Sequence, residues 1–129
     1  MIIPTLVAIA CLWGLLSASG GTVSGTAKYY RAGMFAQVAA NRGMILRADV
    51  AGYASVPSCA WLGSVIQARV NGGAWERYQV VDCSAPKDRA RHIRQGLVLE
   101  VDYASARRNG FVSKGKAPAV VRYGGTYAY

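Results

Sequence analysis

Short segments in which apolar and polar residues alternate run through most of this chain, and glycine-rich turns separate them. Ser64–Val70 alternates in this way, which predicts a half-buried strand. The next three residues are Asn71-Gly72-Gly73, and Asn-Gly is the dipeptide that tight β-hairpins favour. We therefore expect Trp75–Val81 to be the return strand of a hairpin.

The remaining elements are predicted from composition and capping signals. Met34–Ala40 is interpreted as a short amphipathic helix or a loop, and Tyr103–Asn109 as a short helix. Asp102 is a suitable N-cap for the second of these, and Gly110 can adopt the left-handed conformation that ends a helix. Three more segments are predicted strands: Thr26–Tyr30, Leu97–Val101 and Ala119–Tyr123.

About six short strands with one or two short helices, and no regular alternation of strand and helix, predict a mainly β fold and favour a small barrel of mixed topology. We expect this barrel to span residues 26–123, with a linker at 22–25 before it and a flexible tail at 124–129 after it. The chain has 129 residues, which is enough for one such domain.

The first 21 residues differ from the rest because they carry no charge. Ile2–Leu16 is almost entirely apolar, and the small residues Ser17–Gly21 follow it, as in a signal peptide with its cleavage site. The alternative interpretation is an uncleaved apolar helix that anchors the protein in a membrane through residues 2–18. Both interpretations predict an extracytoplasmic protein, either secreted or tethered to the membrane.

The chain is strongly basic: 15 Lys and Arg residues against 6 Asp and Glu residues give a net charge of +9, and every charge lies at or after Lys28. A domain of this charge favours acidic partners, among them nucleic acid, anionic lipid and anionic cell-wall polymers. The sequence has no zinc pattern, recognition-helix signature or Lys/Arg run typical of nucleic-acid binding, so we expect no nucleic-acid partner. A basic surface without any acidic partner is the alternative.

Two cysteines, Cys59 and Cys83, lie in the predicted barrel, and Cys11 lies in the apolar head. In an extracytoplasmic protein such a pair favours a disulfide, which would close a loop of about 25 residues and stabilise the fold by roughly 3–4 kcal/mol. Two reduced, buried cysteines are the alternative. No Cys/His set has metal-ligand spacing, so neither a metal site nor a cofactor is predicted.

Two apolar predicted strands end at an aspartate, Asp82 and Asp102. A carboxylate at the end of a strand lies at the rim of the sheet, where a substrate can reach it. The segment between the strands, Ala85–Arg94, is predicted to be a basic loop and carries the only histidine, His92. The alternatives to a catalytic role are a turn cap for Asp82 and the helix N-cap for Asp102.

Several short motifs, by their order and spacing, resemble the double-psi β-barrel of the rare lipoprotein A type, a fold shared with expansins, barwin-like proteins and some lytic transglycosylases. The motifs are Thr26–Tyr30 with Gly33, the hairpin around Asn71-Gly72-Gly73, Val80-Val81-Asp82, Glu100–Ala106 and Ala117–Val121. The resemblance covers residues 25–123 and implies a six-stranded double-psi β-barrel, here preceded by the N-terminal apolar helix.

The resemblance implies that Asp82 matches the catalytic acid/base of the family, and that Asp102 matches the aspartate of an Asp-Leu-Ser-type turn that starts a helix. In expansin-like and related barrels an aspartate in an HFD-type motif has the functional role, so Asp102 is the second catalytic candidate. Two motifs differ from the family pattern. Cys83-Ser84-Ala85-Pro86 replaces an Arg-Gly-Pro loop after the first aspartate, and Ser55-Val56-Pro57-Ser58 has no histidine where the family has one. His92 would take the place of that histidine only if its loop folds back over the site.

Polysaccharide sites combine aromatic faces with hydrogen-bonding and charged side chains. For the tyrosines the alternative role is packing in the core, because two adjacent residues on a strand face opposite sides. For the arginines and the histidine it is a solvated basic loop. The candidate substrate-binding residues are Tyr29, Tyr30, Trp75, Arg89, Arg91 and His92.

The sequence therefore predicts a monomeric protein that acts on peptidoglycan or another anionic cell-wall glycan. In the enzyme interpretation, Asp82 protonates the glycosidic oxygen and then accepts a proton from the 6-hydroxyl group of the sugar, so that a 1,6-anhydro product forms as in a lytic transglycosylase. A non-catalytic, expansin-like module that binds the wall is the second interpretation. A structural protein whose apolar head packs in a membrane or an assembly is the third.

Overall fold

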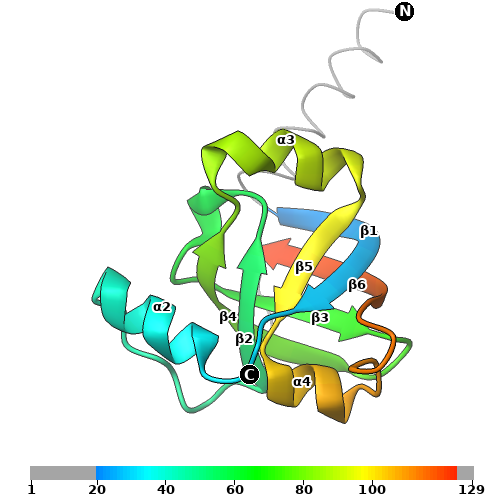
Figure 1. The fold of residues 1–129 in the computed structure, drawn as a ribbon, viewed down its shortest axis with the longest axis horizontal. Helices are drawn as coiled ribbons and strands as arrows, with labels where there is room; N and C mark the ends of the chain where they lie inside the picture. The colour runs from blue at the N-terminus through cyan, green and yellow to red at the C-terminus, as the bar shows by residue number, and fades with distance from the viewer. Residues whose placement is uncertain (1–19, 125–129) are drawn as a thin grey trace, which may run out of the picture.

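Six short strands form a closed barrel, with helices packed around it, in residues 20–124, the part of the chain that the computed structural model describes (Figure 1). The strands are β1 (Gly20–Tyr29), β2 (Gly52–Val56), β3 (Val65–Val70), β4 (Trp75–Cys83), β5 (Leu97–Val101) and β6 (Ala117–Gly124). The helices are α2 (Met34–Arg42), α3 (Pro86–Arg94) and α4 (Tyr103–Arg108), with one short 3-10 turn, η1 (Cys59–Trp61). The prediction of a mainly β, six-stranded barrel is confirmed.

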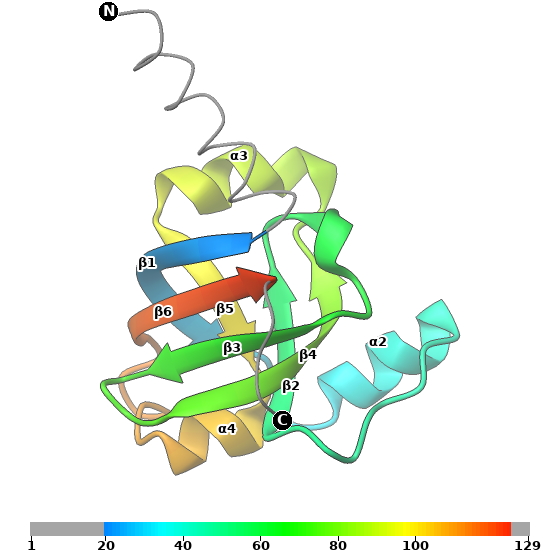
Figure 2. The same ribbon diagram turned by 180° about the vertical axis from the view of Figure 1, so that it is seen from behind.

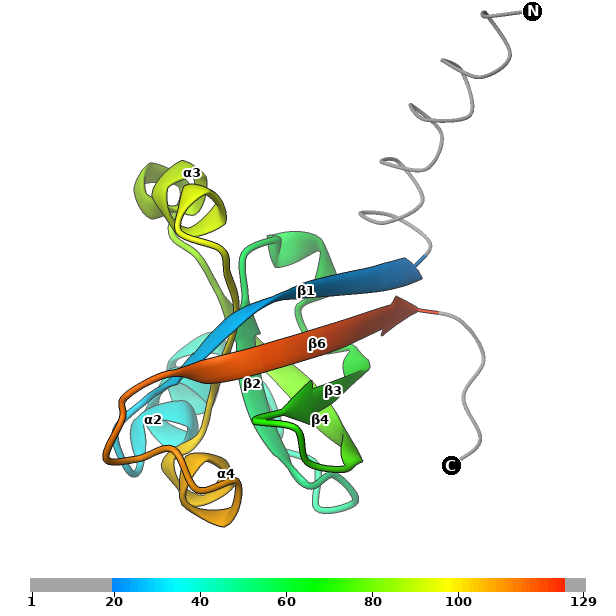
Figure 3. The same ribbon diagram turned by 90° about the vertical axis from the view of Figure 1, so that its right-hand side faces the viewer.

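The strands follow one another around the barrel in the order β1-β5-β2-β4-β3-β6, and β6 closes it by pairing with β1. The pairs β1–β5 and β2–β4 are parallel, and the other pairs are antiparallel. Figure 2 shows β1, β6 and β3 in succession on one face, and Figure 3 shows β1 and β6 running side by side. In Figure 1, α3 lies above the barrel, α4 below it and α2 to one side.

Side chains that alternate along the strands fill the interior of the barrel. On β3, Ile66, Ala68 and Val70 are buried in the core, as the alternation in the sequence predicts. Tyr78 on β4 and Phe111 after α4 are fully buried beside them and supply the largest core side chains. The interior is therefore a packed core, and any binding site has to lie on the outside of the barrel.

A second, smaller cluster attaches α2 to the outer face of β4. Its buried members are Phe35 and Ala39 from the helix and Val81 from the strand. Because these residues lie on the opposite face of β4 from the core, α2 covers one outer side of the barrel and leaves the adjoining side available.

The hairpin predicted at residues 71–73 is confirmed. Asn71 has φ of 55° and Gly72 has φ of 71°, as a type I′ turn requires at both central positions. The Gly73 amide donates a hydrogen bond of 3.0 Å to the Val70 carbonyl oxygen, which closes the turn.

The loop predicted at Ala85–Arg94 is wrong, because this segment forms α3. Pro86 suits the first turn, where its missing N–H costs nothing, and Asp88 and Arg94 lie at the ends that match the helix dipole. None of the residues of α3 is buried, so its sequence lacks the repeating apolar positions by which most surface helices are identified. For this reason the sequence predicted a loop here.

The linker predicted at residues 22–25 is also wrong, because these residues form part of β1 and pair with β6. Backbone pairing holds this glycine-rich stretch in the sheet in spite of its low strand propensity.

Strand β2 is absent from the predicted elements for a related reason. It begins at Gly52, where a side chain would overlap Ser105 and Asp102, and glycine weakens the strand pattern.

The predicted signal peptide or anchor lies outside the described residues, except for Gly20 and Gly21, which begin β1. Cys11 and residues 125–129 of the predicted tail also lie outside them. Between residues 20 and 124, no helix is long and apolar enough to cross a membrane.

A disulfide joins Cys59 in η1 to Cys83 at the end of β4, which confirms the disulfide interpretation over two reduced cysteines. The two residues are 24 positions apart in the sequence. The bond ties the end of β4 to the segment that follows β2.

Replacing both cysteines, Cys59→Ser together with Cys83→Ser, should lower the free energy of unfolding by roughly 3 kcal/mol, because the unfolded chain regains the entropy of the crosslinked loop. Urea unfolding followed by circular dichroism measures this loss. Wild-type protein unfolded under reducing conditions is the control and should lose a similar amount. An unchanged unfolding midpoint in both cases would contradict a stabilising role for the bond.

Candidate functional site

The register between β2 and β4 shifts by one residue, and this shift decides where Asp82 points. Ala54 pairs with Val80, but the next residue, Ser55, pairs with Asp82. Val81 is therefore an extra residue on β4. In an unbroken strand Asp82 would share the interior face of Val80, since side chains alternate. The β-bulge instead turns Asp82 to the outer face, and bulges beside functional sites commonly redirect side chains in this way.

Four polar side chains form a row across the outer face of the barrel. Asp82 on β4 pairs with Ser55 on β2, and Ser55 pairs with Glu100 on β5. Glu100 in turn pairs with Lys28 on β1. Asp82 and Glu100 are thus two strands apart, which corresponds to roughly 9–10 Å between their Cα atoms at the usual strand spacing. The row places two carboxyl groups on one surface.

Asp82 is held by two side chains on one side of this row. The Tyr30 hydroxyl donates a hydrogen bond of 2.9 Å to Oδ2, and Arg42 Nη2 donates one of 2.7 Å to Oδ1 as part of an ion pair. The Tyr30 ring stacks on Phe35 with the ring centroids 4.5 Å apart, which fixes the position of the hydroxyl. Burial raises the pKa of Tyr30, so this hydroxyl stays protonated and continues to donate. Both oxygens of Asp82 therefore accept hydrogen bonds, and these fix the orientation of its carboxyl group.

Glu100 lies in a different environment, although it is only two strands away. Its side chain is half-buried, and no residue among 20–124 donates a hydrogen bond to it. Burial raises the pKa of Glu100 above its ordinary value of 4.5, the charge of Lys28 opposes this rise, and the charge of Asp82 adds to it. Glu100 therefore keeps its proton to a higher pH than a solvated glutamate does.

A cavity of about 660 Å³ lies over the row, between the barrel, the end of β4 and α3. Tyr30, Asp82 and Glu100 line it from the barrel. Ser84 and His92 line it from the side of α3 and are joined by a hydrogen bond of 2.7 Å between Ser84 Oγ and His92 Nδ1. Helix α3 thus brings His92 into the same cavity as Asp82, and both disulfide cysteines lie in the cavity wall.

The predicted substrate-binding arginines have partners within the protein. Arg89 donates hydrogen bonds to the carbonyl oxygens of Pro57, over 2.9 Å, and Ser84, over 3.3 Å. Arg91 forms an ion pair with Asp88, three residues earlier on α3, at 3.1 Å. Arg89 therefore attaches α3 to the segment after β2, while Arg91 is an exposed side chain of the helix.

The other two predicted aromatic candidates lie away from the cavity. Tyr29 packs edge-on against Phe111, and its hydroxyl donates a hydrogen bond of 2.9 Å to the carbonyl oxygen of Val112. Trp75 is partly exposed at the start of β4, and the guanidinium of Arg122 lies 4.0 Å from the centroid of its ring. Neither Tyr29 nor Trp75 lines the cavity around Asp82, whereas the third predicted aromatic residue, Tyr30, does.

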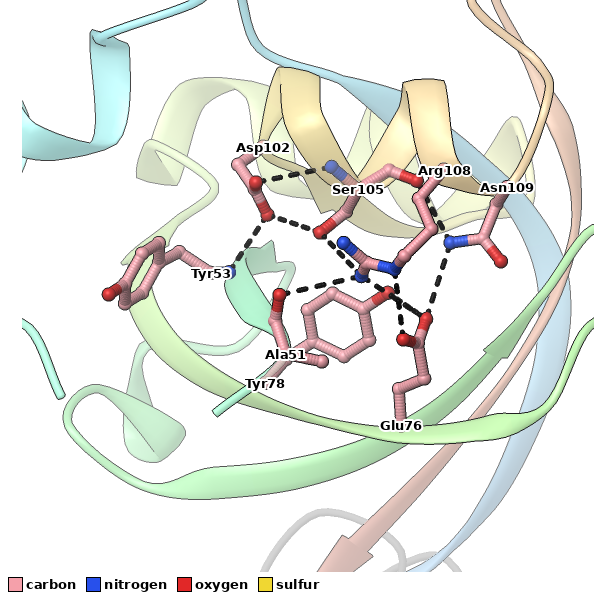
Figure 4. A network of polar contacts seen from close by, with 8 residues as sticks. All are labelled: Ala51, Tyr53, Glu76, Tyr78, Asp102, Ser105, Arg108 and Asn109. Carbon is pink, nitrogen blue, oxygen red and sulfur yellow. Dashed lines mark hydrogen bonds and ion pairs between the residues drawn. The ribbon is translucent and has the colours of Figure 1, made fainter. Parts of the chain in front are cut away.

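Asp102 is the N-cap of α4, which confirms the predicted helix and its cap. One carboxylate oxygen accepts from the Ser105 amide over 3.2 Å, and the other accepts from the Ser105 hydroxyl over 2.6 Å and from the Tyr53 amide over 3.0 Å. Figure 4 shows this cap continuing through Ser105 and Arg108 to Glu76 on β4. Asp102 lines a different cavity from Asp82, so the structure does not bring the two predicted aspartates together.

Several residues of the site are missing from the sequence prediction, among them Glu100 and Arg42. Glu100 is the one charged residue in the apolar run Leu97–Val101, and that position is the signal that could have identified it. Arg42 gave no signal, because a basic residue at the end of a helix is accounted for by the helix dipole alone. Its contact with Asp82 depends on how α2 packs against β4.

A second cavity, of about 320 Å³, is lined mainly by apolar residues. Trp61, Ile93 and Leu97 contribute to it, and Ile93 on α3 is 60% exposed. This apolar groove offers few hydrogen-bonding groups, which distinguishes it from the cavity over Asp82.

The closed barrel with two parallel strand pairs and a polar cavity on its outer face belongs to the double-psi β-barrel class, as the resemblance in the sequence implied. No protein-family model matches the chain, and no curated protein matches it.

Among solved structures, the chain is similar to the expansin of Clavibacter michiganensis. A mutant of that expansin in complex with cellohexaose has a TM-score of 0.56 and 18% sequence identity, over 84% of this chain and 54% of that one. The apo form has a TM-score of 0.52 and the same identity, over 84% of this chain and 53% of that one. This chain therefore spans about half the length of those expansin chains and shares their fold.

Asp102→Ala should lower the free energy of unfolding by about 2 kcal/mol, because the variant loses a helix cap and leaves the Tyr53 amide without its acceptor. Urea unfolding measures the loss. Asp102→Asn is the matched variant and should lose less, because asparagine is also a good N-cap. Equal stability of the alanine variant and the wild type would contradict the structural role of this aspartate.

Glu100→Gln should become more stable relative to the wild type as the pH rises above 4.5. The pKa of Glu100 is raised in the folded state, so as the pH rises Glu100 loses its proton in the unfolded chain before it does so in the folded protein. The wild type therefore loses stability as the pH rises from 4.5 to the folded-state pKa. Unfolding midpoints of both proteins at about pH 4 and about pH 7 measure the difference.

Asp49→Asn is the control with the opposite sign. A hydrogen bond from Arg47 lowers the pKa of Asp49 to about 2, so the stability that Asp49 adds is present above its unfolded pKa and is lost as the pH falls towards 2. If the difference in unfolding midpoint between Glu100→Gln and the wild type is the same at both pH values, Glu100 does not have the half-buried environment described above.

Proposed function

We propose that this protein binds a polysaccharide of the cell wall in the cavity over Asp82 and Glu100. The observation that carries the proposal is the row of polar side chains that the strand register places on one outer face of the barrel, beneath this cavity. Sugar hydroxyl groups both donate and accept hydrogen bonds. Asp82 and Glu100 offer acceptors, and Ser84 and His92 offer a second polar wall.

Two features support a wall polysaccharide over other ligands. The chain shares the fold of an expansin that was solved in complex with cellohexaose. Its net charge of +9 favours a polymer with anionic groups, such as peptidoglycan, over a neutral one. Lys28 and Lys116 lie around a smaller cavity next to the row and are suitable partners for carboxylate groups of the polymer.

The disulfide supports an extracytoplasmic location, because such bonds persist in oxidising compartments. A wall-binding protein requires the same location. The apolar residues at the start of the chain, as a signal peptide or an anchor, would direct the protein there.

Cleavage of the glycan, with Asp82 as the acid/base of a lytic-transglycosylase-like reaction, is the second candidate function. The specific observation in its favour is that Asp82 and Glu100, two of the carboxyl groups that line the cavity, lie in unlike environments, since such pairs divide acid and base roles in glycosidases. The lytic reaction uses the 6-hydroxyl group of the sugar as its nucleophile and needs no attacking water.

Purified protein should sediment with peptidoglycan at low salt and less at high salt, because salt screens the attraction between a basic protein and an anionic polymer. Sedimentation with cellulose should be weaker. Asp82→Asn should reduce binding to peptidoglycan by about 10-fold, since it breaks the contact with Arg42 and removes a charged acceptor.

Asp49→Asn is the matched control, because it removes the same charge at an exposed ion pair outside the cavity. It should bind as well as the wild type or slightly better. Binding of the wild type to neither polymer at low salt would refute the proposed function, and equal binding by Asp82→Asn would place the site elsewhere on the surface.

A further inference from the structure

We infer that Glu100 is the proton donor for cleavage of a glycosidic bond in this cavity, and that Asp82 is the base. The inference rests on the proposed function, because it requires a glycan strand in the cavity. It changes the role of Asp82 from an acid that also acts as a base to a base alone.

The hydrogen bonds of Asp82 determine its role. Its two oxygens accept from Tyr30 and from the guanidinium of Arg42, at 2.9 Å and 2.7 Å. Arg42 makes an ion pair with this carboxyl group, and the Tyr30 hydroxyl donates to its other oxygen, so both neighbours present donors to Asp82. The side chain of Asp82 is still 18% exposed in the cavity, so a sugar hydroxyl can reach it. In both contacts the oxygens of Asp82 act as acceptors, which is the role of the group that receives the proton of the sugar hydroxyl.

Glu100 has the opposite surroundings. It lines the same cavity, is half-buried, and receives no hydrogen bond from residues 20–124 that would hold it ionised. Burial raises its pKa, which suits a general acid, because the group is then still protonated when the substrate binds. Lys28, opposite Glu100 on β1, is placed to stabilise the carboxylate that forms once the proton has left.

The spacing of the two groups fits a sugar between them. Asp82 and Glu100 are separated by Ser55, and two strand spacings put their Cα atoms roughly 9–10 Å apart. Side chains on one face stand roughly perpendicular to a sheet, so the Cα separation sets the scale of the distance between the carboxyl groups, and inverting glycosidases hold theirs about 6.5–9.5 Å apart. Burial raises the pKa of Tyr30, and the charges of Glu100 and Asp82 both contribute to the rise, so both carboxyl groups lie near its hydroxyl and face one region of the cavity.

The step balances without a co-reactant. Glu100 gives its proton to the glycosidic oxygen, the bond from that oxygen to C1 breaks, and the bonding electrons leave with the oxygen. Asp82 takes the proton of the 6-hydroxyl group, and that oxygen bonds to C1 to form a 1,6-anhydro ring. One glycan strand gives two shorter strands, and the carboxyl groups return to their first state by exchanging protons with solvent.

The test compares cleavage and binding by the same variants. Wild type, Glu100→Gln and the control Asp49→Asn are incubated with peptidoglycan, and soluble products with 1,6-anhydro ends are measured by mass spectrometry. Glu100→Gln should lower the cleavage rate by about 100-fold or more, as loss of a general acid does, while sedimentation with peptidoglycan falls much less, because the amide keeps the size of the acid and its ability to donate and accept hydrogen bonds. Asp49→Asn should match the wild type in both measurements. The wild-type rate should fall as the pH rises through the folded-state pKa of Glu100, and the residual rate of Glu100→Gln should lack this fall.

Three results would overturn the inference: Glu100→Gln cleaves as fast as the wild type, its residual rate keeps the fall with pH, or the wild type binds peptidoglycan and releases no 1,6-anhydro product. In each case binding by the wild type leaves the proposed function intact. Failure of the wild type to bind would instead refute the proposed function itself. If Glu100→Gln does not fold, Glu100→Asp replaces it. Slow cleavage by Glu100→Asp with normal binding supports the inference, and cleavage by Glu100→Asp at the wild-type rate overturns it.

Discussion

The extra residue on β4, Val81, is the constraint on which the site depends. Without it, alternation would point Asp82 into the core beside Val80, where a carboxylate without partners is too costly to bury. With it, Val81 and Asp82 both lie on the outside. Val81 packs against Phe35 and Ala39 and so positions α2, and the same helix ends at Arg42, which pairs with Asp82. One shift of register therefore sets the direction of the carboxylate, the place of the helix that covers part of the barrel, and the cation that pairs with the carboxylate.

The two aspartates that follow apolar strands have different tasks because of what lies next to each. Asp102 is followed by a helix, and the amide and hydroxyl of Ser105 use its oxygens as a cap. The network around it joins α4 to β2 and β4, so it stiffens one end of the barrel (Figure 4). Asp82 is followed by a disulfide cysteine and a turn, and its oxygens bind side chains only. The cavity above it is walled by α3, which the disulfide and Arg89 hold in place.

The sequence was sufficient where signals are local. Asn71 and Gly72 specify the β3–β4 hairpin, and Asp102 with Gly110 delimit α4, since each depends on the conformation of a few neighbouring residues. Helix α3 was missed because it buries no residue, and β2 because Gly52 weakens its pattern. The outward direction of Asp82 follows from pairing with a strand about 25 residues earlier, and no local pattern encodes such a register shift. Glu100 was not identified as a site residue for the same reason: its neighbours Ser55 and Lys28 are supplied by other strands.

The central claim is that the outer-face row under α3 is where a glycan binds. Titration of isotope-labelled protein with a soluble fragment of peptidoglycan, followed by amide chemical shifts in nuclear magnetic resonance spectra, tests it most directly. The account predicts that the largest shifts occur at Tyr30, Ser55, Asp82 and Glu100 and at the Ser84–His92 wall of the cavity. Largest shifts around Trp61 and Leu97 in the apolar groove, or no shifts as the fragment is added, would contradict it.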